Sequence, residues 1–170
     1  MVRQVALIGR VLGRIARQMN DLNEDTARAI VEALHAAWSK GDVDGMLTWC
    51  HDDVTHYLNA GAPDGGPLRL FGKTELRSFL RPIVQIAESM TVPTSFTFRD
   101  GIGRAQIEAY VQHRKTRNVL SGTFRQFVIF KGFKIAALEN YHDAAKMKAF
   151  WEMVRSEELQ THRAHRGDYD

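Results

Sequence analysis

The feature that most constrains this chain is a helix break that leads through a short second helix into extended structure. Residues 36–39 are typical of a helix end, Lys40-Gly41 stops that helix, and Asp42 can cap the next one. The second helix is predicted over about 43–51 and is followed by a strand at about 54–59. A chain that begins in this way is expected to fold as a mixture of helices packed on a sheet, an α+β protein.

The segments on either side complete the pattern. Asn23-Glu24-Asp25 offers caps for the helix that ends at Lys40, and a Gly/Pro-rich loop fills residues 61–67. A third helix is predicted over about 73–89, with Pro82 expected to kink it. Four strands follow, at about 91–99, 103–116, 120–130 and 133–142.

Three further signals refine the second half of the chain. Pro93 cannot donate a ladder hydrogen bond, so its strand is expected to begin late or to lie at the edge of the sheet. Asp100-Gly101 is typical of a hairpin turn. Asp143 can cap a closing helix, in which Phe150 and Val154 would be buried.

The order ααβαββββ over residues 25–155 resembles the NTF2-like superfamily. The motifs that carry the resemblance are Gly41-Asp42, Asp52-Asp53-Val54, Phe71-Gly72-Lys73 and Tyr141-His142-Asp143. The resemblance, which is to SnoaL-like and ketosteroid isomerase-like proteins, implies a cone-shaped α+β fold. In that fold three helices pack on a strongly curved, mostly antiparallel sheet, and the chemistry lies inside the cone. Helices at both termini would be additions to it.

The sequence divides into three parts. Residues 23–157 are predicted to form the SnoaL-like domain, and residues 158–170 a disordered tail. Residues 1–22 are predicted to form an amphipathic N-terminal helix or extension, because apolar residues of 1–18 follow helical spacing while four arginines fall mainly on the other side. That helix would pack on the domain or on a partner, precede a translation start at Met19, or, as the less favoured alternative, contact a membrane through residues 1–18.

The charge distribution excludes nucleic acid as a partner. The chain carries a net charge of +3, but residues 1–18 alone hold four arginines and no acid, and the last ten residues are balanced. Removing both segments leaves a central domain with a net charge of −1, which provides no basic surface for phosphates.

The single cysteine, Cys50, lies among apolar residues and is predicted to be a buried thiol. A chain without disulfides or an obvious export signal is expected in the cytoplasm.

Alternation along the strands predicts which side chains face the inside of the cone. In 103–116 the odd positions are apolar, and that face ends at His113. The next strand, matched to ketosteroid isomerase, places Arg125 and Phe127 inward. The apolar opposite face of 124–130 would then pack against a second copy in a homodimer, as occurs in the superfamily.

The predicted lining combines polar groups with an apolar wall. His56, His113 and Arg125 are the candidate catalytic residues, the histidines as acid or base and Arg125 as an oxyanion donor. The candidate ligand-binding residues are Trp38, Trp49, Leu58, Ile107, Phe127, Asn140 and His142. An apolar cavity with a few converging polar groups is typical of a small-molecule site. The histidines share no metal-ligand spacing, so no metal site is predicted, and no cofactor is expected.

The resemblance also argues against the chemistry of two of these enzymes. Alignment with ketosteroid isomerase puts Leu34 and Leu58 where that enzyme has its tyrosine and its general base. The segment that resembles limonene epoxide hydrolase has Asn140 in place of an inward aspartate, and an amide is neither acid nor base there.

Two hypotheses therefore remain, and whether the chain is an enzyme stays open. The first is a SnoaL-like protein that binds a small hydrophobic carbonyl compound and isomerises, cyclises or dehydrates it by histidine acid–base chemistry. The second is a non-catalytic ligand-binding or dimerisation module, which this fold also provides.

Overall fold

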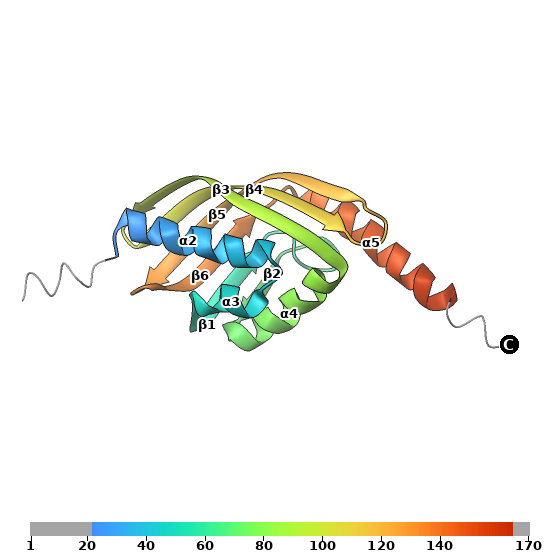
Figure 1. Ribbon diagram of the computed structural model, residues 1–170, viewed down its shortest axis with the longest axis horizontal. Coiled ribbons are helices and arrows are strands. Elements are labelled where there is room, and N and C mark those ends of the chain that lie inside the picture. Colours follow the sequence, from blue (N-terminus) through green and yellow to red (C-terminus); the bar gives the residue numbers. More distant parts are fainter. Residues whose placement is uncertain (1–21, 165–170) are drawn as a thin grey trace, which may run out of the picture.

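The computed structural model describes residues 22–164, so the predicted N-terminal helix lies outside the described residues. The helices are α2 (Glu24–Ser39), α3 (Val43–Thr48), α4 (Gly72–Ile86) and α5 (Ala144–Ala164). The strands are β1 (Cys50–Leu58), β2 (Leu68–Phe71), β3 (Ala87–Arg99), β4 (Ile102–His113), β5 (Val119–Lys131) and β6 (Lys134–Tyr141). This is the predicted α+β architecture, a curved open sheet with helices packed on it (Figure 1).

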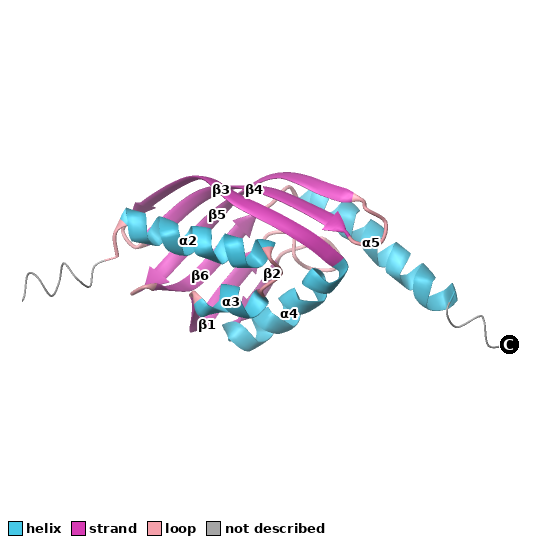
Figure 2. Ribbon diagram, viewed as in Figure 1, coloured by secondary structure: helices cyan, strands magenta, loops and turns pink. Residues whose placement is uncertain are grey.

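The six strands form one sheet in the order β2-β1-β6-β5-β4-β3. All neighbouring strands are antiparallel except β1 and β6, which pair in parallel. Figure 2 shows α2 lying along the sheet and α3 and α4 together beside β1, while α5 extends away toward the C-terminus. Helix α2 packs mainly against β3, and α4 mainly against β1, so the two helices cover different parts of the sheet.

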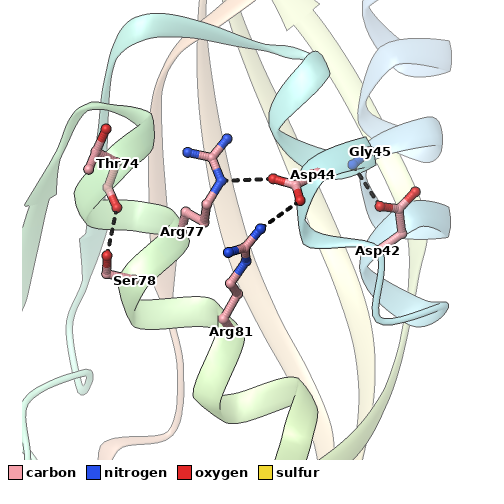
Figure 3. A network of polar contacts seen from close by, with 7 residues as sticks. All are labelled: Asp42, Asp44, Gly45, Thr74, Arg77, Ser78 and Arg81. Atoms are coloured by element: carbon pink, nitrogen blue, oxygen red, sulfur yellow. Dashed lines mark hydrogen bonds and ion pairs between the residues drawn. The ribbon is translucent and has the colours of Figure 1, made fainter.

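The helix break at residues 40–45 is formed as predicted. Gly41 adopts a left-handed φ of 71°, and the Asp42 carboxylate accepts a hydrogen bond of 2.8 Å from the Gly45 N–H at the start of α3 (Figure 3). A Cβ atom on Gly45 would lie 2.1 Å from that carboxylate. A side chain at this position would force the Asp42 carboxylate to shift, whereas glycine leaves the cap undisturbed.

A second contact fixes α3 against α4. The Asp44 carboxylate accepts hydrogen bonds from Arg77 Nε at 2.7 Å and from an Arg81 terminal nitrogen at 2.9 Å (Figure 3). The two guanidinium groups hold the pKa of Asp44 below its ordinary value. All three side chains are on the surface, so this bridge orients the helices more than it stabilises the fold.

Two element boundaries differ from the sequence prediction. Helix α3 ends at Thr48 rather than near 51, and β1 begins at Cys50, because Cys50 pairs with Ile135 and the Ile135 N–H donates to Trp49 O at 2.9 Å. Strand β3 begins at Ala87, earlier than predicted, where it pairs with His113. In both places long-range strand pairing overrides the local helical pattern.

Strand β3 does lie at the edge of the sheet, which is where its proline is tolerated. Its register with β4 shifts between Pro93 and Ser95.

Pro82 lies inside α4, which continues to Ile86. The four-residue strand β2 was not predicted, since its sequence is too short for alternation to be recognised.

The predicted facing of β4 is correct, whereas that of β5 is wrong. Ala105 pairs with Gln126 and Ile107 with Phe124, so the even residues of β5 share the inner face with the odd residues of β4. Val128 is fully buried on that face. A shift of one residue exchanges the two faces of a strand, and matching to a distant relative introduced such a shift.

Arg125 and Phe127 therefore point outward, not into the cone. Arg125 is exposed, and Phe127 lies against the guanidinium of Arg104, 5.9 Å from its ring centroid. The face of β5 expected to contact a second copy, which carries Phe124 and Val128, is instead buried against the core.

Helix α5 extends further than predicted. Residues 158–164, expected in a disordered tail, belong to this helix, and residues 165–170 lie outside the described part of the chain. Asp143 caps its start as expected, by accepting a hydrogen bond from the Lys146 N–H. Phe150 and Val154 are buried, and Glu158 accepts a hydrogen bond from His113 Nε2 at 3.0 Å.

The core agrees with the predicted role of the cysteine. Cys50 is 1% exposed among apolar residues of α3, β1 and β6, and burial raises the pKa of its thiol to about 11. The thiol is therefore protonated at neutral pH and serves as a packing group. Within residues 22–164 no helix is long and apolar enough to cross a membrane.

Candidate functional site

A cavity of about 710 Å³ occupies the space between the sheet and the helices. Its volume is within the range of small-molecule sites. The wall is mostly apolar and draws on every layer of the fold, with side chains that include Leu34, Trp38, Leu58, Phe79, Ile83, Val111, Phe124, Leu138, Met147 and Trp151. An apolar ligand could bury most of its surface here.

Two small residues on facing strands make room for the cavity. Ala109 on β4 pairs with Gly122 on β5, and both line the cavity. A Cβ atom placed on Gly122 would meet nothing within 4 Å, and its φ is not left-handed. Gly122 is therefore required by no local contact or turn. Its effect is to leave the cavity open.

A chain of buried polar side chains runs along the inner wall and begins on α2. The imidazole of His35 lies 2.8 Å from Thr91 Oγ1 through Nδ1 and 3.1 Å from Gln126 Oε1 through Nε2. Since the Gln126 oxygen can only accept, His35 Nε2 carries a proton. Burial lowers the pKa of His35, so the ring is neutral and its Nδ1 accepts from the Thr91 hydroxyl.

The chain continues through two amides to the second buried histidine. Gln126 Nε2 donates to Asn140 Oδ1 at 2.9 Å, and Asn140 Nδ2 donates to His56 Nε2 at 3.2 Å. Burial, reinforced by the nearby imidazole of His142, lowers the pKa of His56 to about 4. His56 is therefore neutral near pH 7, and because its Nε2 accepts, its proton is on Nδ1.

The last donor of this chain has no partner. His56 Nδ1 is buried and makes no hydrogen bond within the described residues, and the same holds for the Ser89 hydroxyl oxygen. Both residues line the cavity. An unsatisfied buried donor costs about 1–3 kcal/mol. Nδ1 is also shielded from solvent, so a ligand oxygen would reach it only with a small shift of the surrounding side chains.

His142 is the third imidazole on the wall. Its ring stacks on Phe124, with 4.2 Å between ring centroids, and burial lowers its pKa to about 4. Among the described residues no hydrogen bond to its ring nitrogens is found, whereas its backbone N–H donates to Asn59 Oδ1 at 2.7 Å. His142 thus presents a neutral imidazole, and its backbone is held in place.

The structure brings together half of the predicted site residues. Trp38, His56, Leu58, Asn140 and His142 line the cavity, whereas Trp49, Ile107, His113, Arg125 and Phe127 do not. Ile107 is buried in the core and Trp49 packs against it. His113 faces inward as predicted, but Thr116 and Glu158 engage its two ring nitrogens at the far end of β4. Its position is typical of a structural residue.

Three residues of the cavity wall were not among the predicted site residues, namely His35, Thr91 and Gln126. A signal for His35 existed, because it continues the buried stripe of Ala27 and Val31 at intervals of four residues. Gln126 is the single polar residue on an otherwise apolar strand face, but the wrong facing of β5 concealed it. In the part of the chain that the structure describes, no three His, Cys, Asp or Glu side chains are grouped so as to hold a metal ion.

Taken together, the fold and the position of the cavity define the class: this chain has the NTF2-like fold, with its cavity inside the cone. No protein-family model matches the sequence, and no curated protein matches it either. Solved structures do match, and all those described below are less than 25% identical in sequence.

Three similar structures illustrate the range of proteins with this fold. A candidate polyketide cyclase from Xanthomonas campestris is 22% identical, with a TM-score of 0.65, covering 75% of this chain and 98% of its own. An NTF2-like protein of unknown function from Burkholderia pseudomallei is 19% identical, with a TM-score of 0.64 and coverages of 72% and 94%. TerC, co-crystallised with polyporic acid, is 17% identical, with a TM-score of 0.64 and coverages of 76% and 98%.

Proposed function

We propose that this protein binds a small hydrophobic molecule that bears a carbonyl oxygen. The observation that carries the proposal is the apolar cavity whose wall includes an unsatisfied buried donor, His56 Nδ1–H. A carbonyl oxygen accepts a hydrogen bond and cannot donate one, so it complements this donor. Similarity to a candidate polyketide cyclase and to TerC with polyporic acid is consistent with an organic ligand inside the cone.

The absence of charge on the inner wall supports a neutral group at this end of the ligand. Leu34 and Leu58, which align with the tyrosine and the general base of ketosteroid isomerase, line the cavity. On β5 the residue that faces inward is Gln126 and not its neighbour Arg125. Asn140 is also inward, where limonene epoxide hydrolase has a carboxylate. None of these side chains is a strong acid or base, which supports recognition through neutral hydrogen bonds.

Binding of N-phenyl-1-naphthylamine, a neutral fluorescent probe, tests this proposal. The substitution Gly122→Leu fills the cavity without a steric clash at Cβ, so we expect the protein to remain folded and its affinity for the probe to fall at least about tenfold. The matched control is Thr97→Leu, on β3 at an exposed position outside the cavity lining, which should bind normally. Equal binding by the two variants would place the probe elsewhere and refute the cavity as the site.

Competition against the same probe tests the carbonyl group. 1-Tetralone and tetralin share one ring skeleton and differ by the ketone oxygen. Although tetralin is the more hydrophobic, we expect tetralone to displace the probe about threefold or more effectively, because a hydrogen bond contributes about 0.5–1.5 kcal/mol. Stronger displacement by tetralin would argue against a carbonyl ligand.

The proximity of two imidazoles favours a second, catalytic function. His142 has ring nitrogens without a protein partner and lies close enough to His56 to influence its pKa. His142 could remove a proton next to a bound carbonyl, while His56 Nδ1–H stabilises the enolate oxygen. Exchange of the C2 hydrogens of 1-tetralone with D₂O, followed by NMR, tests this function. An exchange rate unchanged by His142→Phe would leave the protein as a non-catalytic binding module.

A further inference from the structure

All the charged side chains on the cavity wall come from one short segment. These residues are Asp143, Lys146, Lys148 and Arg155, which lie just before α5 and along the helix as far as its middle. The opposite wall, formed by α2, β1, β4, β5 and β6, has only apolar and neutral polar groups near neutral pH. The cavity is therefore polarised, with neutral donors at its inner end and formal charge along α5.

Two of the four charged groups are already engaged. The Asp143 carboxylate accepts a hydrogen bond from the Lys146 backbone N–H, as the cap of α5. Lys148 Nζ lies 3.8 Å from Glu152, one turn further along the helix. Neither group is fully available for a ligand.

The other two charges are cations without an acidic partner in the described part of the chain. Lys146 and Arg155 are both exposed, and no ion pair of either side chain occurs among residues 22–159, whose side chains the structure describes. Trp151, which is half-buried and also lines the cavity, lies between them in the sequence. Exposed residues on a cavity wall mark its mouth, so the mouth, with three cations and the carboxylate of Asp143, carries a net positive charge.

We propose that the ligand of this cavity is amphipathic, with an anionic oxyacid group, such as a carboxylate, at the mouth, where Lys146 and Arg155 make the surroundings positive. This inference rests on the proposed function and extends it. The apolar body and the acceptor oxygen occupy the inner part, where a charge would lose its solvation. The anionic group stays at the solvent-exposed mouth, where it keeps most of its water and is attracted by the cations there.

A pair of probes with one skeleton separates this proposal from the proposed function. 8-Anilino-1-naphthalenesulfonate carries a sulfonate on the anilinonaphthalene skeleton of the neutral probe N-phenyl-1-naphthylamine. We expect Lys146→Gln combined with Arg155→Gln to weaken binding of the sulfonate about three- to tenfold, and of the neutral probe less than about twofold. In 1 M NaCl, where the screening length is about 3 Å, most of the difference should disappear.

The control is a double variant that changes the net charge equally but away from the cavity. Lys40 and Lys131 are exposed and do not line the cavity, so Lys40→Gln with Lys131→Gln should leave both probes unaffected. Equal loss of sulfonate binding in the two double variants would mean that net charge alone explains the effect, and it would overturn the proposal. Parallel loss of both probes in the first variant would show damage to the wall, which also overturns it. If neither probe binds the wild-type protein, the proposed function itself fails.

Discussion

At the scale of single residues, the chain of side chains from Thr91 to His56 determines what the cavity can recognise. Each member donates to the next, so the proton positions on His35 and His56 are fixed by the amides between them. The chain ends in a donor, and this is why the inner end favours an acceptor oxygen. A single amide with the opposite orientation would break the sequence of donors, which makes Gln126 as important as either histidine.

The buried imidazoles predict how stability depends on pH. His56 and His142 have pKa values of about 4 in the folded protein and close to 6.5 when unfolded. The unfolded chain therefore binds more protons between pH 4 and 6.5, and the folded state loses stability as the pH falls through that window. Each imidazole accounts for about 2 kcal/mol of that loss at pH 5.

Urea unfolding at pH 7.5 and pH 5 checks this prediction. We expect His142→Phe to lose less stability than the wild type between the two conditions, because phenylalanine retains the stacking on Phe124 without binding a proton. At pH 7.5 the two proteins should be similar. An unchanged pH dependence in the variant would show that His142 is not buried as a neutral group.

At the scale of elements, α5 is the part of the cavity wall most open to perturbation. The helix contributes Met147 and Trp151 to the cavity, but only Phe150 and Val154 are buried among the side chains described in it. The contact of Glu158 with His113 holds its second half. An element with so few buried contacts opens more easily than the sheet does.

Substitution of Phe150 by alanine should therefore detach the helix selectively. Removing a buried phenylalanine side chain destabilises the folded helix by about 3 kcal/mol or more. The loss cannot exceed the free energy needed to open α5 locally. Hydrogen exchange followed by mass spectrometry should show faster exchange in residues 144–164 and unchanged protection in β4 and β5. Glu152→Ala, on the exposed side of the helix, is the control. Uniformly faster exchange would mean that α5 unfolds only with the whole domain.

At the scale of the whole molecule, homodimerisation stays a prediction. The surface that would form the dimer is no longer the face of β5 that carries Phe124 and Val128, because that face is buried in the core. The exposed outer face of β3, β4 and β5 carries large apolar side chains, namely Met90, Val92, Tyr110, Val119 and Ile129. Met90, Val92 and Tyr110 also line a shallow groove of about 300 Å³ on that face. A second copy packed there would cover these residues.

Sedimentation velocity over a range of concentrations checks the association. We expect the wild type to sediment as a dimer and Met90→Lys to sediment as a monomer, since a lysine at the centre of an interface must be desolvated. The cavity faces the other side of the sheet, so probe binding should persist in the variant. A wild type that remains monomeric at high concentration would exclude the dimer.

The sequence alone determined the features that depend on local chemistry and alternation. Capping by Asn23, Asp42 and Asp143, the break at Gly41, the inward face of β4 and the inner positions on β1 and β6 all follow from residues close together in the chain. These are properties of single turns and single strands, and they were sufficient for the fold. They also placed Trp38, His56, Leu58, Asn140 and His142 on the cavity wall.

Which strand faces meet, and which polar groups form hydrogen bonds with one another, depends instead on long-range packing. The inward face of β5 depends on its register with β4, where a one-residue shift exchanges Arg125 for Gln126. The chain that joins His35 to His56 spans α2, β3, β5, β6 and β1, with partners up to 91 residues apart. No local pattern encodes such contacts, because each of these side chains finds its hydrogen-bond partner on a distant element. That partner also determines which ring nitrogen of each histidine carries the proton.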